Sequence, residues 1–148
     1  MTIINNTTVL VFTSEELKSV LEQNNNYTYI YFGANITLPS GIKIASTKTN
    51  VTIDGTYQNI TYTLEDMKNL SASNTINVSS STIAKVTVAN INIIGNNYYG
   101  VIYVPESTTY ANTIIEYNNI TYIGPQLSFH PNNNWFQNHH RRCINHNR

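Results

Sequence analysis

Apolar and polar residues alternate in short runs along this chain, and one such run occurs three times. Each copy begins with Asn, continues with apolar residues at alternate positions and ends in Gly; the copies are residues 50–55, 90–95 and 119–124. Alternation with period two predicts a β-strand with one buried face, and the closing Gly predicts a tight corner. Because no long helical pattern separates the copies, we expect the strands to stack, each burying its apolar face against the next.

Further runs with the same period predict strands before and between the copies. They are residues 29–32, 35–38, 41–44, 60–64, 75–78, 86–88, 101–104 and 114–117. The copies are unevenly spaced, so insertions such as 65–73 must leave the stack as loops, with a short helical turn or loop over 65–70. An antiparallel sandwich is the alternative, but hairpin dipeptides are scarce, since Asp54-Gly55 is the only one.

One amphipathic helix is predicted over residues 14–23. Thr13 and Glu16 have the spacing of a capping box, and Leu17, Val20 and Leu21 follow on one helical face. A stack of coils has an open apolar end that must be covered. We therefore expect this helix to be an N-terminal lid on the stack.

Composition supports a single β-rich domain. The chain has 148 residues, of which 41% are hydrophobic and 11% charged, which is enough for one sizeable core. The periodic pattern ends near Gln126, so we predict a β-helix domain over 1–126 and an irregular C-terminal tail over 127–148. The tail holds the only Trp, the only Cys and every Arg. A shift in reading frame is one hypothesis for this change of composition.

Charge is unevenly distributed along the chain. Residues 1–126 hold five Lys, no Arg and eight Asp or Glu, a net charge of −3, while three Arg and four His follow Gln126. This argues against nucleic acid as a partner, which requires clustered Lys and Arg. The single Cys143 excludes an intrachain disulfide. The first twelve residues lack basic side chains, so we expect no signal peptide, and no later run is long enough for membrane insertion.

These runs resemble the pectate lyase-like adhesive domain of surface proteins from Gram-positive bacteria. The resemblance covers most of residues 9–126 and is carried by residues 12–17, 29–38, 50–57, 61–64, 92–100 and 122–126. It implies an all-β fold, a right-handed single-stranded parallel β-helix with an N-terminal capping α-helix, and adhesion rather than cleavage. The chain departs from the family's pattern in lacking an export signal and further coils after Gln126, which suggests a fragment or a truncated gene product.

Residues that would carry lyase or hydrolase chemistry are missing from the pattern. A pectate lyase needs several carboxylates around Ca²⁺ and a strong base, commonly Arg, and a hydrolase of this fold needs clustered Asp. The five carboxylates of the later body share no motif; they are Asp54, Glu65, Asp66, Glu106 and Glu116. We therefore predict no catalytic residue, no cofactor and no metal site.

The other polar residues have simpler structural interpretations. Asp54 beside Gly55 is interpreted as a corner residue that bonds its own backbone. Asn residues at successive corners can stack into hydrogen-bonded ladders. The His residues of the tail lack the paired Cys and His spacing of a zinc site.

The one surface stretch that suggests a ligand is residues 96–99. Tyr98 and Tyr99 are adjacent, so in a strand they would point to opposite faces, and at most one would be buried. The other could stack on a sugar ring while the amides of Asn96 and Asn97 bond its hydroxyl groups. The alternative is that both tyrosines pack locally around a corner bounded by Gly100.

The sequence therefore predicts a non-catalytic adhesion or carbohydrate-binding module of a bacterial surface protein. Its partner would be a polysaccharide or a host or cell-surface ligand, and its place in the parent protein extracellular or at the cell surface. Two alternatives stay open. One is a fragment of a polysaccharide lyase whose catalytic coils lie beyond Gln126, and the other a structural stub that self-associates through its open C-terminal edge.

Overall fold

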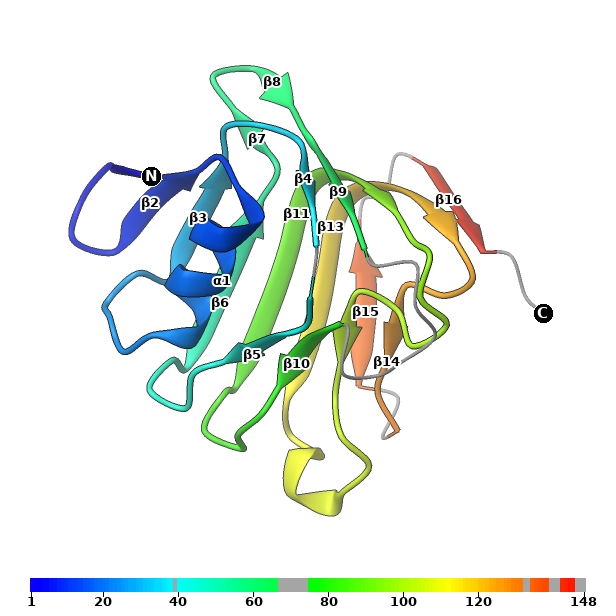
Figure 1. The fold of residues 1–148 in the computed structure, drawn as a ribbon. Coiled ribbons are helices and arrows are strands. Elements are labelled where there is room, and N and C mark those ends of the chain that lie inside the picture. Colours follow the sequence, from blue (N-terminus) through cyan, green and yellow to red (C-terminus); the bar gives the residue numbers. More distant parts are fainter. Residues whose placement is uncertain (39, 67–74, 132–133, 139–141, 146–148) are drawn as a thin grey trace.

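A computed structural model describes residues 1–38, 40–66, 75–131, 134–138 and 142–145 (Figure 1). In these residues the chain is mostly β with one α-helix, so the predicted all-β class is confirmed. The elements are β1 (Thr2–Ile3), β2 (Thr8–Val11), α1 (Ser14–Glu22), β3 (Tyr29–Phe32), β4 (Ile36–Thr37), β5 (Ile42–Ile44), β6 (Asn50–Asp54), β7 (Thr56–Tyr57), β8 (Ile60–Thr61), β9 (Thr63–Glu65), β10 (Ile76–Val78), β11 (Lys85–Ile94), β12 (Ile102–Tyr103), the 3-10 helix η2 (Thr108–Tyr110), β13 (Ile114–Gly124), β14 (Ser128–Phe129), β15 (Trp135–Asn138) and β16 (Arg142–Asn145).

The strands form three parallel ladders, and successive segments of the chain supply one strand to each. The first ladder is β2, β3, β6, the first half of β11, the first half of β13, and β15. The second is β4, β9, the second halves of β11 and β13, and β16. The third is β5, β10, β12 and β14. In the described part of the chain, only β1 with β2 and β7 with β8 pair antiparallel, which contradicts the sandwich alternative.

Apolar side chains from the three ladders meet in one core. Residues in register on neighbouring strands form buried columns because alternate residues of a strand face the same side. The columns include Val51, Val86 and Ile115 in the first ladder, Leu64, Ile93 and Tyr122 in the second, and Ile42, Ile76 and Ile102 in the third. The period-two pattern of the sequence is thus the pattern of inward and outward positions.

Helix α1 lies at the N-terminal end of the ladders, where it covers the core (Figure 1). Thr13 is the N-cap, and its hydroxyl accepts the backbone N–H of Glu16 at 3.1 Å. Leu17, Val20 and Leu21 are buried in the core, and the carbonyl of Leu21 accepts the N–H of Ala45, just after β5, at 2.9 Å. The helix and its buried face agree with the sequence prediction.

Polar corners stack at the bend between the first and second ladders. Asn90 and Asn119 have φ of 51° and 52°, the left-handed region that Asn tolerates better than most residues. The Asn119 amide donates to Asn90 Oδ1 at 2.9 Å, and the Asn90 amide to Asp54 Oδ2 at 3.3 Å. Asp54 Oδ1 also accepts the N–H of Thr56 at 3.0 Å. The predicted Asn ladder and the corner role of Asp54 are both present.

The three copies of the repeated run are not structurally equivalent. This corrects the expectation that all three stack directly on one another. The copies at 90–95 and 119–124 are in register, with Ile91 opposite Ile120. The copy at 50–55 pairs instead with the preceding residues of β11, Lys85 opposite Asn50. The hairpin of β7 and β8 follows Gly55, so β9 rather than β6 lies beside the second half of β11.

The irregular tail predicted over 127–148 is corrected for the part that the structure describes. β14 pairs with β12, and β15 and β16 both pair with β13. A strand that adds to an existing edge gains its hydrogen bonds from the neighbour, so it needs little alternation of its own. The boundary at Gln126 and the reading-frame hypothesis stay predictions. Of the helical turn expected over 65–70, residues 67–70 lie outside the described residues.

Candidate functional site

The predicted binding stretch, residues 96–99, forms the turn between β11 and β12. The carboxylate of Asp66, which follows β9, accepts the backbone N–H groups of Asn96 and Asn97, the latter at 3.3 Å. At the other end of the turn, Gly100 has φ of 82°, and a Cβ there would lie 2.6 Å from the Cα of Ser128. The turn is therefore fixed at both ends, by a buried carboxylate and by close packing on β14.

The two asparagines of the stretch hold the turn together. Asn97 is 0% exposed, and its Oδ1 accepts the N–H of Tyr99 at 3.0 Å. The Asn96 amide donates to the carbonyl of Asp66 at 3.1 Å and to Glu65 Oε1 at 3.4 Å. Both side chains serve the fold, which leaves the two tyrosines as the accessible part of the predicted site.

Tyr98 and Tyr99 lie in a turn rather than a strand, so they do not point to opposite faces. Tyr98 is 49% exposed and Tyr99 half-buried. Their rings meet edge to face, with centroids 5.8 Å apart. The local packing considered as an alternative is therefore present, and it leaves one tyrosine ring largely open to solvent.

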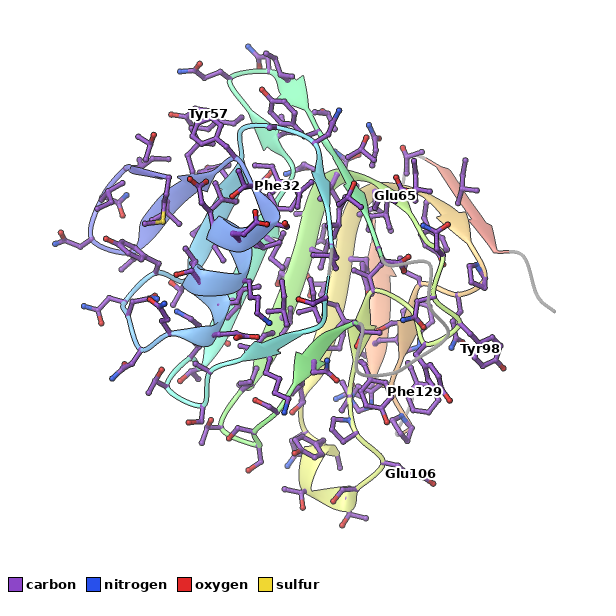
Figure 2. All side chains as sticks on the ribbon, in the orientation of Figure 1. Phe32, Tyr57, Glu65, Tyr98, Glu106 and Phe129 are labelled. Carbon is purple, nitrogen blue, oxygen red and sulfur yellow. The ribbon has the colours of Figure 1, made fainter. Side chains whose placement is uncertain are left out.

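Tyr99 joins the turn to two rings that the sequence analysis did not identify. It contacts Tyr103 of β12 at 5.8 Å and Phe129 of β14 at 5.6 Å between centroids. Tyr103 and Phe129 stack at 5.2 Å with 16° between their planes. We call Tyr98, Tyr99, Tyr103 and Phe129 the aromatic cluster. Figure 2 shows Tyr98 and Phe129 together on one side of the molecule and Tyr57 on the opposite side.

The aromatic cluster depends on how β12 and β14 pair, and this explains why the sequence did not reveal it. Tyr103 and Phe129 are direct partners in the pairing of β12 with β14, although far apart in the sequence. The one available signal was the outward position of Tyr103 in the alternating run 101–104. Phe129 lies beyond the predicted domain boundary, in the segment expected to be irregular.

The cluster suits a ligand with flat apolar faces and polar edges. Tyr combines a broad ring with a hydroxyl that donates or accepts a hydrogen bond. Sugar rings have this form, because their C–H groups face one side while hydroxyl groups project from the edges. Rings already packed against each other lose little freedom when such a ligand stacks on them.

The carboxyl group of Asp66 accepts hydrogen bonds from the backbone of this turn. Burial raises its pKa to about 6, although the N–H groups of Asn96 and Asn97 oppose the shift. Its role in the structure is to accept backbone hydrogen bonds from the turn.

Of the other carboxylates considered from the sequence, Glu65 adjoins Asp66 at this turn, whereas Asp54 and Glu116 lie elsewhere. Asp54 is at the Asn ladder, and Glu116 pairs with Lys85 at 3.0 Å. Hydrogen bonds from Asn118 and Lys85 lower the pKa of Glu116. Within the described ranges, no group of three or more His, Cys, Asp or Glu is arranged to hold a metal ion.

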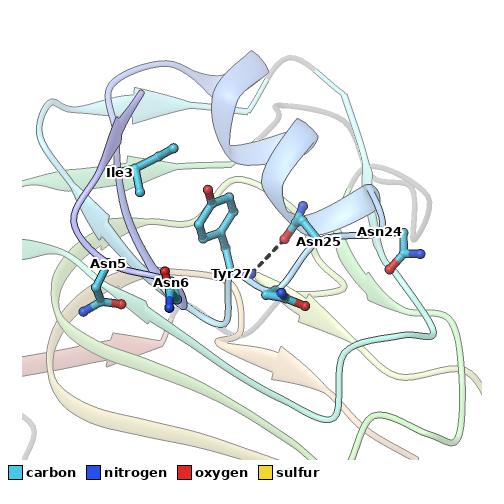
Figure 3. A pocket seen from close by; sticks show the side chains of 7 residues that line it. Ile3, Asn5, Asn6, Asn24, Asn25 and Tyr27 are labelled. Carbon is cyan, nitrogen blue, oxygen red and sulfur yellow. Dashed lines mark hydrogen bonds between the residues drawn. The ribbon is translucent and has the colours of Figure 1, made fainter.

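A hollow lies beside the C-terminal end of α1, and amide side chains dominate its lining (Figure 3). Its volume is about 660 Å³, and its lining residues are Ile3, Asn5, Asn6, Asn24, Asn25, Asn26 and Tyr27. Asn25 Oδ1 accepts the N–H of Tyr27 at 3.0 Å and the ammonium of Lys48 at 2.7 Å. Asn25 therefore has a structural role at this end of the molecule.

Comparison with known proteins identifies one family. The sequence profile of the pectate lyase-like adhesive domain matches residues 8–129. No curated protein and no solved structure matches the chain. Among the residues described, no helix has the length and apolar character needed to cross a membrane.

Proposed function

The chain belongs to the family of pectate lyase-like adhesive domains, and from this premise we propose that it is a non-catalytic, carbohydrate-binding adhesion module of a bacterial surface protein. The adhesive description of the family supports a surface-associated, non-enzymatic role. The observation that carries the choice of ligand is the aromatic cluster, four rings linked through Tyr99, with Tyr98 half-exposed. The ligand would be a polysaccharide or a glycan on a host or cell surface.

The architecture we propose for the module is a right-handed parallel β-helix capped by α1. The three parallel ladders with shared register support it, as do the buried apolar face of α1 and its contact with the residue after β5. In such a fold the turns between ladders project outward, so a rigid stack would present the aromatic turn to a ligand.

Binding to insoluble polysaccharides tests the proposed function. The wild-type chain should bind at least one of cellulose, xylan, mannan and chitin, and Tyr98→Ala and Tyr99→Ala should each weaken that binding about 5- to 10-fold, the loss expected for one stacked ring. Tyr57→Ala is the matched control, since Tyr57 contacts Tyr31 on the opposite side of the molecule. Unchanged binding in both cluster variants would contradict the proposal. Release of unsaturated uronate products from pectin would overturn the non-catalytic part.

Self-association is a second candidate function, suggested by the C-terminal edge. In the part of the chain that is described, β15 and β16 pair only with β13, which leaves the backbone groups of their other edge for another strand. Phe136 of β15 is exposed on this edge strand. Sedimentation velocity over a range of concentrations should then show a growing dimer, whereas a monomer at every concentration would exclude this role.

A further inference from the structure

The outward side chains of the third ladder continue the aromatic cluster toward α1. Lys43 is in register with Asn77, Asn77 with Tyr103, and Tyr103 with Phe129. All four alternate with buried residues of their strands and are exposed or half-buried. We call these four residues the third-ladder row. It crosses four neighbouring strands, and three strand spacings amount to roughly 14 Å.

Asn77 presents a fixed hydrogen-bond acceptor in the middle of the row. Its amide nitrogen donates to the carbonyl of Thr75 at 3.0 Å and to that of Ile42 at 3.4 Å. These two bonds orient the side chain, and no donor among the described residues reaches its Oδ1. A preoriented acceptor of this kind loses little freedom on binding a hydroxyl group.

Lys43 places donors at the end of the row. Its side chain is exposed, and it makes no salt bridge with any residue that the structure describes. The neighbouring Glu22 is already used, because its carboxylate accepts the ammonium of Lys18 and the backbone N–H of Lys43, both at 3.0 Å. The Lys43 ammonium therefore remains available to a ligand on this face.

We propose that the third-ladder row binds a linear glycan lengthwise, across the strands. One sugar would stack against the aromatic cluster, and the following sugars would meet the Asn77 acceptor and then the Lys43 donors. The row offers a ring, an acceptor and a donor in sequence along one line, which matches a chain of hydroxylated rings. This inference rests on the proposed carbohydrate-binding function and adds the direction and extent of the ligand.

The length of the glycan is the variable that tests the proposed binding role of the third-ladder row. Isothermal titration of the wild-type chain would use fragments of cellulose, xylan, mannan and chitin, from monosaccharide to tetrasaccharide. Affinity should rise with length in at least one series. Lys43→Gln and Asn77→Ala should each weaken tetrasaccharide binding about 2- to 10-fold, the value of one hydrogen bond, and leave monosaccharide binding unchanged.

Lys85→Gln is the matched control, because Lys85 lies on the first ladder and pairs with Glu116; it should bind every fragment as the wild type does. The proposed binding role of the row would be wrong if affinity did not depend on glycan length, or if the Lys43→Gln variant bound the tetrasaccharide normally. Either result would leave the proposed function intact. Failure of the wild type to bind any fragment or any of the four polysaccharides would overturn both. Because Lys43 is exposed, its variant should fold even if Asn77→Ala does not.

Discussion

At the scale of single residues, the corner asparagines combine two properties that few side chains share. Asn90 and Asn119 adopt positive φ, and each donates a hydrogen bond to the neighbouring rung. Glycine would accept the backbone conformation but not the bond, whereas alanine would provide neither. The abundance of Asn at these corners therefore has a structural cause that requires no ligand.

Substitutions at Asn119 separate the two properties. Asn119→Gly should lower the free energy of unfolding by about 1 kcal/mol through the lost hydrogen bond. Asn119→Ala should lower it by about 2 to 3 kcal/mol, because the left-handed conformation adds 1 to 2 kcal/mol for a residue with a Cβ. Urea unfolding measures both values. Equal losses in the two variants would show that backbone strain is absent.

The buried carboxylate of Asp66 predicts a pH dependence of stability. Its folded pKa of about 6 lies above its ordinary value of 3.8 because burial disfavours the charged form. The folded state therefore binds the proton more tightly than the unfolded state, so this group destabilises the fold above pH 6 and that cost disappears as the pH falls toward 4. In urea unfolding, the Asp66 contribution to the free energy of unfolding should increase as the pH is lowered from about 7 to about 5.

Asp66→Asn is the control for this prediction, because an amide of the same size does not titrate in this range. The variant should gain less stability than the wild type over the same change of pH. If the two chains respond identically, Asp66 is not the group responsible.

At the scale of elements, a helix or strand could be predicted where its own stretch of sequence carries the pattern, whereas the pairing of distant strands could not. β3, β10 and α1 follow from period two or from a capping box, and the structure confirms them. The register of β6 could not be predicted, because the inserted hairpin of β7 and β8 decides which strand lies beside which. The aromatic cluster was predicted only in its Tyr98 and Tyr99 half, since contact with Tyr103 and Phe129 arises from pairing distant strands.

The lid role of α1 gives a prediction for a single core substitution. Leu21 is fully buried on the inner face of the helix, so Leu21→Ala should lower the free energy of unfolding by about 2 to 5 kcal/mol, as cavities of this size do. Glu15→Gln, on the exposed side of the helix, should change it by less than about 0.5 kcal/mol. Similar small effects in both would mean that the helix does not seal the core.

At the scale of the whole molecule, the fold separates a structural interior from an outward face that could bind a ligand. The core columns, the Asn ladder and α1 stabilise the stack. The aromatic cluster and the third-ladder row lie outside it, on neighbouring strands that hold them in register. A binding surface of this kind needs no moving part, so most of its binding energy would be available to the ligand.

Chemical-shift mapping on the intact chain tests the central claim, that the aromatic cluster binds carbohydrate. With tyrosine and phenylalanine rings labelled, titration with a soluble fragment of the best-bound polysaccharide should shift the signals of Tyr98, Tyr99, Tyr103 and Phe129. The signals of Tyr29, Tyr31 and Tyr57, which form a separate group of rings, should stay unchanged. Shifts confined to that second group, or no ring shifts at saturating ligand, would contradict the account.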